Sequence, residues 1–305
     1  MTTKYTSPRF DIAFKKLFAS QKDSALTVSF LNAVLEYKAG EKIVSLQIMD
    51  PTNLPDREGL RISFVDVKCT DEKGNKYIIE MQFSAQPYFF KRALFYSGKG
   101  LIEQLKPTED YDLLVPVIFV GVLNFNFFIN DLDYVTHHGI VNLKTKEISS
   151  DHMAFHFIEL EKFTKTADQL ETKLDKWIYL LKEADQFNEI PWQLNDSEEI
   201  KRALHLLELN RWTRQEQEIY DQQIDNARQL KSSFENAEKR GEIKGIAKGI
   251  AKGKIEGEAK GKIEGEAKKA IEIAKNLLAI NVELETISTA TGLDINSIKK
   301  LKTSS

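Results

Sequence analysis

Two carboxylates and one amide stand inside otherwise apolar segments of this chain. Asp66 lies in RISFVDVKCT (residues 61–70), and Glu80 and Gln82 lie in KYIIEMQF (residues 76–83). Burying a charged group is costly unless it is paired or bound to a metal ion. Mg²⁺ typically takes one or two carboxylates and keeps several waters, and it can polarise a phosphate and activate an attacking water. The residue types therefore suggest metal-assisted phosphodiester hydrolysis, with Asp66 and Glu80 as ligands and Gln82 positioning the water.

The segment DEKGN (residues 71–75) between these two apolar stretches is typical of a hairpin turn. A three-residue loop of residues 73–75, with Asn75 in the left-handed conformation, would pair Asp66 with Gln82 and Lys68 with Glu80. Because side chains alternate along a strand, these four would share one face, with Asp66 and Glu80 as diagonal neighbours. A two-residue turn would separate the two carboxylates. The alternative for this set is a polar sheet edge facing solvent, with Lys68 forming an ordinary cross-strand pair.

A helix is expected after the hairpin, starting near Pro87 and continuing through FFKRALFYSGKGLIEQL to about Leu105. Residues 84–106 carry four basic side chains and one acidic side chain. Lys91, Arg92 and Lys99 are therefore candidates for contacts with a DNA backbone. The alternative is an ordinary solvated helix face.

The surrounding elements follow from the hydrophobic periodicity. Helical spacing precedes the hairpin at residues 10–18 and 26–35. Strands are expected at residues 43–49, 61–70, 76–83, 113–123, 135–143 and 153–160. Helices are then expected at 161–183, at 197–210 and from 213 onward. This order predicts an α/β fold with a mixed sheet flanked by helices and a mostly helical C-terminal extension.

Three segments resemble one known family: SPRFDIAFKKLFAS, FVDVKCTDEKGNKYIIEMQFS and FKRALFYSGKGLIEQL. They are similar to the PD-(D/E)XK nuclease family transposases, also called recombination-promoting (Rpn) nucleases, over about residues 7–240. The resemblance implies a restriction-endonuclease-like core and Mg²⁺-dependent DNA cleavage, with Mn²⁺ able to substitute for Mg²⁺.

The resemblance also implies a role for each motif residue. Asp66 matches the motif's Asp, Glu80 its second acid, and Gln82 the position usually written Lys. Glutamine cannot supply the positive charge of that lysine, so cleavage could be slower or restricted in substrate. Asp11 matches an acid before the FKxLF segment and is given an accessory role, as is Lys68 beside the motif.

The overall composition limits the class of protein. The chain has 305 residues, 43 basic and 46 acidic side chains and a net charge of −3, which excludes DNA binding through bulk positive charge but allows a local basic groove. A single cysteine excludes a disulfide framework and a cysteine-rich zinc site. No secretory signal and no stretch of ~20 apolar residues is seen, so a cytoplasmic protein without a membrane span is expected.

The five histidines do not favour a zinc site. His137 and His138 are adjacent, so in a strand they point to opposite faces. His152 and His156 flank a predicted strand and would face one side, but no cysteine or acid stands at matching spacing.

A glycine falls at every fourth position from Gly241 to Gly265, with Lys and Glu between. This tract predicts either a flexible or partly helical spacer, or a helix that self-associates or tracks DNA through its glycine stripe. Residues 238–269 hold ten basic and six acidic side chains, so a basic tail follows an acidic body. A homo-oligomer formed through this tail is one expectation.

Four regions are predicted from these patterns: a nuclease-like core (1–160), a helical extension (161–240), a glycine-rich spacer (241–269) and a small helical module (270–305). The last has a helix-turn-helix pattern around Gly292, and is either a DNA-binding module or a helical cap. The predicted function is a Mg²⁺-dependent DNA endonuclease. The alternatives are a catalytically weak DNA-binding component of a transposition or recombination complex, and a scaffold that assembles through its tail.

Overall fold

The computed structural model describes residues 4–50, 52–53, 63–86 and 88–303. The chain divides into two compact units, Met1–Arg228 and Gln229–Ser305, which are described separately below. No helix among the described residues is both long and apolar enough to cross a membrane.

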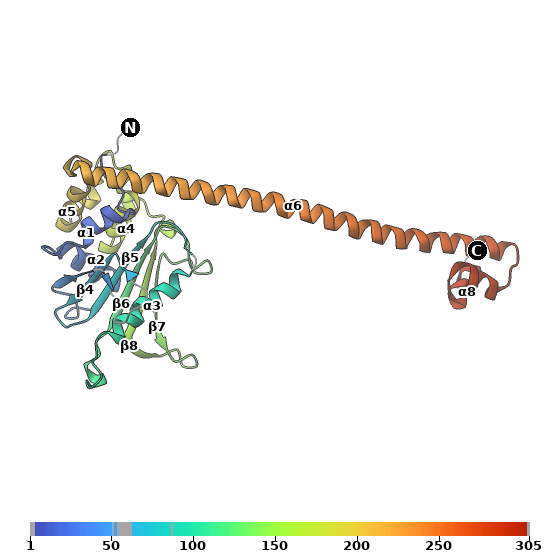
Figure 1. The fold of residues 1–305 in the computed structure, drawn as a ribbon, viewed down its shortest axis with the longest axis horizontal. Helices are drawn as coiled ribbons and strands as arrows, with labels where there is room; N and C mark the ends of the chain where they lie inside the picture. Colours follow the sequence, from blue (N-terminus) through green and yellow to red (C-terminus); the bar gives the residue numbers. More distant parts are fainter. Residues whose placement is uncertain (1–3, 51, 54–62, 87, 304–305) are drawn as a thin grey trace. The chain divides into compact units, whose positions relative to one another are not determined.

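A six-stranded mixed sheet forms the centre of the first unit (Figure 1). Its order is β1-β4-β5-β6-β8-β7, in which β5, β6 and β8 are parallel and the other neighbours are antiparallel. The strands are β1 (Leu46–Met49), β4 (Val67–Asp71), β5 (Lys76–Gln82), β6 (Val117–Leu123), β7 (Val135–Val141) and β8 (Ile148–Glu159). The prediction of a mixed sheet is confirmed. The central β6 is buried along its whole length, as its continuous apolar sequence indicates.

The strand predicted over residues 61–70 is interrupted. Residues 61 and 62 lie outside the described residues, and β3 (Ser63–Phe64) pairs with β2 (Thr52–Asn53) in a separate two-stranded sheet. The backbone then bends at Asp66 before β4 begins at Val67. At this bend the Asp66 carboxylate accepts a hydrogen bond from the Met81 N–H at 2.7 Å. The side chain thus binds the backbone of the neighbouring strand just beyond the end of the β4–β5 ladder.

Four helices pack against one face of the sheet, with a large apolar core between them. They are α1 (Asp11–Phe18), α2 (Ala25–Leu35), α4 (Lys173–Glu183) and α5 (Glu198–Leu207). Phe18, Phe30 and Trp177 pack together in this core, with ring centroids 4.9–5.8 Å apart. Apolar side chains of β4, β5, β6 and β8 belong to the same cluster, so this core joins the sheet to all four helices.

One helix, α3 (Phe89–Ile102), covers the opposite face of the sheet. Its buried positions include small residues, and a Cβ added at Gly100 would lie 3.3 Å from a Val117 methyl group. Phe89 packs edge-to-face on Phe119 and Phe157 of the sheet beneath. The close approach of α3 brings its side chains over β5 and β6, and β5 carries Glu80 and Gln82.

The helices after the sheet are shorter than the sequence suggests. Residues 161–172 contain short 3₁₀ turns, and α4 begins only at Lys173, where Thr172 and Asp175 form a capping box. Ser197 caps α5, whose last residue is Leu207. The proposed division of the chain into four regions stays a prediction.

The glycine tract lies within one continuous helix, α6 (Arg214–Ala279). In the part of the chain that the structure describes, a Cβ added at any glycine from Gly241 to Gly265 would meet no atom within 4 Å, so the tract makes no close packing contact. Beyond it, α7 (Leu284–Thr291) and α8 (Ile295–Thr303) are separated by Gly292 in a left-handed conformation. The two short helices and their turn are as predicted, and Ala274, Ile287 and Ile298 form their small core.

Candidate active site

The β4–β5 turn differs in detail from the predicted one. Asp71 and Asn75 close it, with the Asp71 N–H donating to the Asn75 carbonyl at 3.0 Å. Gly74 has the left-handed conformation, with φ +90°, and not Asn75. The Asp71 carboxylate explains this choice, because it accepts hydrogen bonds from the Lys73 and Asn75 N–H groups, both at 2.9 Å. These bonds hold Asn75 at the start of β5 and leave the left-handed position to glycine, which adopts it without strain.

The predicted pairing of the two strands is therefore wrong by two residues. Lys68 pairs with Ile78, where the prediction had Glu80. Because the shift is even, it does not change which face each side chain occupies. Lys68 and Glu80 do share the α3 face, because Lys68 contacts Glu103, the residue that follows α3, and Glu80 contacts Arg92 of α3. The pairing ends at Val67 opposite Ile79, and the backbone bends at Asp66, so Asp66 does not pair with Gln82 as predicted and instead accepts the Met81 N–H.

Asp66 is held from two sides at the end of the ladder. Its Oδ2 atom accepts the Met81 N–H, and its carboxyl shares a hydrogen bond with Asp11, the first residue of α1. Burial raises the pKa of Asp66 above its ordinary value although the Met81 N–H opposes this, and the Asp11 carboxyl raises it further. Asp11, predicted as an accessory residue, thus contacts the motif aspartate directly.

Glu80 is only 3% exposed. Its Oε2 atom accepts a 3.4 Å hydrogen bond from the Gln82 amide and lies 3.8 Å from Arg92 Nη2. Its Oε1 atom is buried and has no hydrogen-bond partner among the described residues. Burial, followed by the charge of Asp66, raises the pKa of Glu80 strongly, and Arg92 only partly offsets this. The site therefore holds two neighbouring carboxyl groups, and the charge of Asp66 disfavours ionisation of Glu80.

One residue near this pair was not singled out from the sequence. Lys15 lies one helical turn after Asp11 on α1, and its Nζ atom is 2.8 Å from Asp11 Oδ1. Partial burial opposes its charge, but the hydrogen bond to Asp11 and the charges of Asp66 and Glu80 raise the pKa of Lys15. The i,i+4 spacing of Asp11 and Lys15 in the sequence was the available signal for this cation.

The three basic residues of α3 that are predicted to contact a DNA backbone have different surroundings. Arg92 reaches Glu80, and its guanidinium also lies over the rings of Phe89 and Tyr96. Lys91 is exposed and lies 5.0 Å from the centroid of the Tyr88 ring. Lys99 forms a 3.5 Å ion pair with Glu103, which also pairs with Lys68 at 3.4 Å. Contact of these residues with DNA stays a prediction.

The donor set at Asp66 and Glu80 fits a hard divalent cation. Both ligands are carboxylates, and the partnerless Glu80 Oε1 is a buried acceptor of the kind that a cation would satisfy. Among the described residues, no three His, Cys, Asp or Glu side chains come together as a complete metal cluster. A cation here would therefore bind two carboxylates and complete its shell with water, as Mg²⁺ commonly does.

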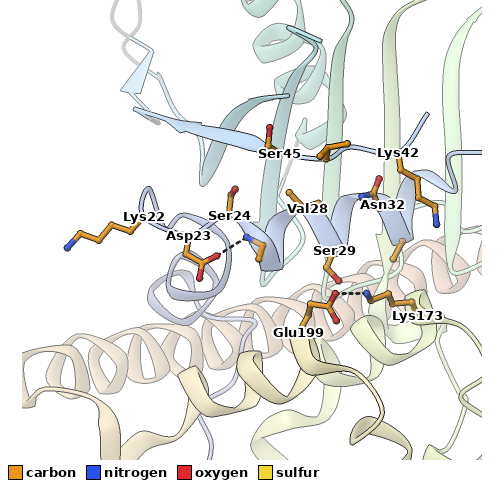
Figure 2. A pocket seen from close by; sticks show the side chains of 13 residues that line it. Lys22, Asp23, Ser24, Val28, Ser29, Asn32, Lys42, Ser45, Lys173 and Glu199 are labelled. Carbon is orange, nitrogen blue, oxygen red and sulfur yellow. Dashed lines mark hydrogen bonds and ion pairs between the residues drawn. The ribbon is translucent and has the colours of Figure 1, made fainter. Parts of the chain in front are cut away.

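A separate cleft of about 710 Å³ is lined by none of the predicted site residues (Figure 2). It lies against α2, and several of its polar groups already have partners. Lys173 forms a 2.8 Å ion pair with Glu199, and the Asp23 carboxylate accepts the Ala25 N–H at 3.0 Å. The Asn32 amide forms hydrogen bonds with both backbone groups of Ile43. The cleft is therefore not part of the candidate site.

A mixed sheet between two helical layers, with two carboxylates where neighbouring strands meet, defines a restriction-endonuclease-like fold. A sequence model of the family described as PD-(D/E)XK nuclease family transposase matches residues 8–237, and the chain belongs to this family. The resemblance noted in the three sequence segments is thereby confirmed. No curated protein and no solved structure matches the chain.

Proposed function

We propose that this protein is a DNA endonuclease that depends on Mg²⁺, with Mn²⁺ able to substitute, and that Asp66 and Glu80 hold the metal ion. The observation that carries the proposal is the buried pair itself. Asp66 and Glu80 are neighbouring carboxyl groups with raised pKa values, and one buried oxygen of Glu80 has no partner among the described residues. Such a pair is unfavourable for the metal-free protein and is relieved by a divalent cation, so stability alone does not explain it.

Each neighbouring side chain has a role in this proposal. When bound, the cation would polarise the scissile phosphate and lower the pKa of the attacking water. Gln82, bonded to Glu80, orients that water through its amide. Asp11 keeps the Asp66 carboxyl in place. Lys15 supplies the positive charge that Gln82 lacks at the motif position.

Arg92 links the metal site to DNA binding in this proposal. Its guanidinium lies 3.8 Å from Glu80 and partly neutralises it. A cation at Glu80 would take over that role and free Arg92 to contact a DNA phosphate, with Lys91 and Lys99 along the same helix. The contacts of the guanidinium with Phe89 and Tyr96 keep it beside the site during this exchange.

Nicking of a supercoiled plasmid in Mg²⁺ or Mn²⁺ tests the proposal. The wild type should nick, Asp66→Ala and Glu80→Gln should not, and the exposed Asp151→Asn should nick like the wild type. Cleavage that survives Asp66→Ala would refute the site assignment.

Gln82 also supports a second candidate, a DNA-binding component of a transposition or recombination complex with weak catalysis. Glutamine carries no charge with which to stabilise a transition-state phosphate. Specific DNA binding by the wild type in a gel-shift assay, without nicking in either metal ion, would favour this candidate over the nuclease.

A third candidate, a scaffold that assembles through α6, is supported by the uncovered glycine stripe. Light scattering of the full chain and of residues 1–240 tests it. Oligomers that disappear on truncation would support assembly through the tail, and oligomers present in both proteins would not.

A further inference from the structure

A histidine pair lies far in sequence from the carboxylates, at the β7 edge of the sheet. β7 and β8 pair His137 directly with His156. Their Nδ1 atoms are 2.6 Å apart, and their ring centroids are 4.8 Å apart with the planes at 70°. The sequence pattern pointed to His152 and His156 as neighbours on one strand. The cross-strand partner depends on a register that no local spacing reveals.

A contact between two Nδ1 atoms requires one of them to carry a hydrogen and the other to offer a lone pair. If that hydrogen moves to the Nε2 atom of the same ring, both Nδ1 atoms offer a lone pair to a metal ion and both rings remain neutral imidazoles, the form that binds metals. His137 is exposed, which gives an ion a path to the pair.

The donor type of the pair favours one class of metal ion. The 2.6 Å between the two Nδ1 atoms is the length of the present hydrogen bond. With metal–nitrogen bonds of about 2.0–2.1 Å, two ligands lie about 2.9–3.3 Å apart, so the rings need to separate by only a few tenths of an ångström. Imidazole nitrogens suit the late first-row ions, and the affinity of such sites rises through Ni²⁺ to Cu²⁺.

We propose that His137 and His156 form a binding site for a late first-row transition-metal ion, Cu²⁺ or Ni²⁺, separate from the carboxylate site. His138 does not join it, because its ring stacks on Phe128 with centroids 4.7 Å apart and its Nε2 atom contacts the Thr136 hydroxyl at 3.0 Å. In the described ranges no third His, Cys, Asp or Glu completes a cluster, so the remaining positions take water or an external donor. The site has nitrogen ligands only, so Mg²⁺ does not compete for it.

Cu²⁺ binding to the full-length chain, prepared without an affinity tag, tests the proposal. The Asp66→Asn variant serves as the background, so that copper at the carboxylates does not contribute. Electron paramagnetic resonance should show one Cu²⁺ per chain with coupling to two imidazole nitrogens, undisturbed by excess Mg²⁺. His137→Ala should weaken Cu²⁺ binding by about tenfold or more, because even outer-shell partners of a metal site cost that much.

The matched control is His152→Ala, which removes an exposed histidine from β8, the strand that also carries His156. It should leave the Cu²⁺ affinity unchanged. Because His156 is largely enclosed, circular dichroism should check that His156→Gln still folds. The proposal is judged on His137→Ala, because His137 is exposed. Equal Cu²⁺ affinity in the His137→Ala and His152→Ala variants would overturn the proposal, as would copper signals without imidazole coupling. Neither result bears on DNA cleavage by the Asp66 site.

Discussion

Arg92 Nη2 lies 3.8 Å from Glu80 Oε2, and this contact joins α3 to the motif strand β5. The arginine only partly offsets the effects of burial and of Asp66, so the pKa of Glu80 remains raised. The Arg92 Nε atom and Glu80 Oε1 are both buried without hydrogen-bond partners among the described residues. The two side chains are thus close, but each retains a buried polar atom without a hydrogen bond. This arrangement is compatible with the proposed exchange, in which a cation replaces Arg92 beside Glu80.

Glu80→Gln should stabilise the metal-free protein while abolishing cleavage. A carboxyl whose pKa is raised on folding binds protons more tightly in the folded state, so its ionisation costs stability as the pH rises through that range. Glutamine removes this cost, which we expect to be about 1 kcal/mol or more near pH 8 and absent near pH 4. Urea unfolding at both pH values measures it, with Asp151→Asn as the control. A destabilised Glu80→Gln protein at the higher pH would contradict the raised pKa.

Binding of Mg²⁺ or Mn²⁺ should become tighter as the pH rises and should release protons. Both Asp66 and Glu80 have raised pKa values and must lose their protons to act as ligands. Calorimetric titration in two buffers of different ionisation enthalpy measures the proton release. The Glu80→Gln variant should bind more weakly and release fewer protons. A metal affinity that does not change between about pH 6 and pH 8 would count against these two ligands.

Lys15→Gln should lower the rate of plasmid nicking by about 100-fold, the usual cost of removing one charge that stabilises a transition state. Its binding of uncleaved DNA should change little in comparison. Adding Gln82→Lys to this variant should restore part of the rate, because the charge returns at the motif position. Lys22→Gln, an exposed residue shortly after α1, is the control. If the control variant loses as much rate as Lys15→Gln, Lys15 has no special role.

Gly121→Ala should destabilise the first unit by about 1–3 kcal/mol through overpacking. Gly121 pairs with Glu80 in the sheet, and a Cβ there would lie 2.8 Å from a ring carbon of Phe157. Gly98→Ala in α3 is the matched control, because in the described structure a Cβ at that position meets nothing within 4 Å. It should be neutral or stabilising, since alanine favours a helix. Thermal unfolding of both variants compares the two, and similar melting temperatures would contradict the close contact.

Much of the sheet and its motif could be predicted because the signals are local. Side chains alternate along each strand, so Lys68 and Glu80 lie on one face even when the pairing shifts by two residues. The segment DEKGN marks the turn between the two strands. The exact pairing could not be predicted, because it depends on the hydrogen bonds of the Asp71 carboxylate to the turn backbone. Those bonds determine whether Gly74 or Asn75 adopts the left-handed conformation, and the sequence is compatible with either residue.

The amino-acid sequence by itself determined the family, the order of helices and strands, and Asp66, Glu80 and Gln82 as the residues to examine. These features are encoded in consecutive residues and in short periodic patterns, which can be recognised without knowing how the elements pack. Only the tertiary structure decided what surrounds those residues. Asp11 reaches Asp66 and pairs with Lys15 because α1 packs at the end of the β4–β5 ladder, and Arg92 reaches Glu80 because α3 crosses the other face of the sheet. Contacts between distant segments depend on which elements pack together, and no spacing along the chain encodes that.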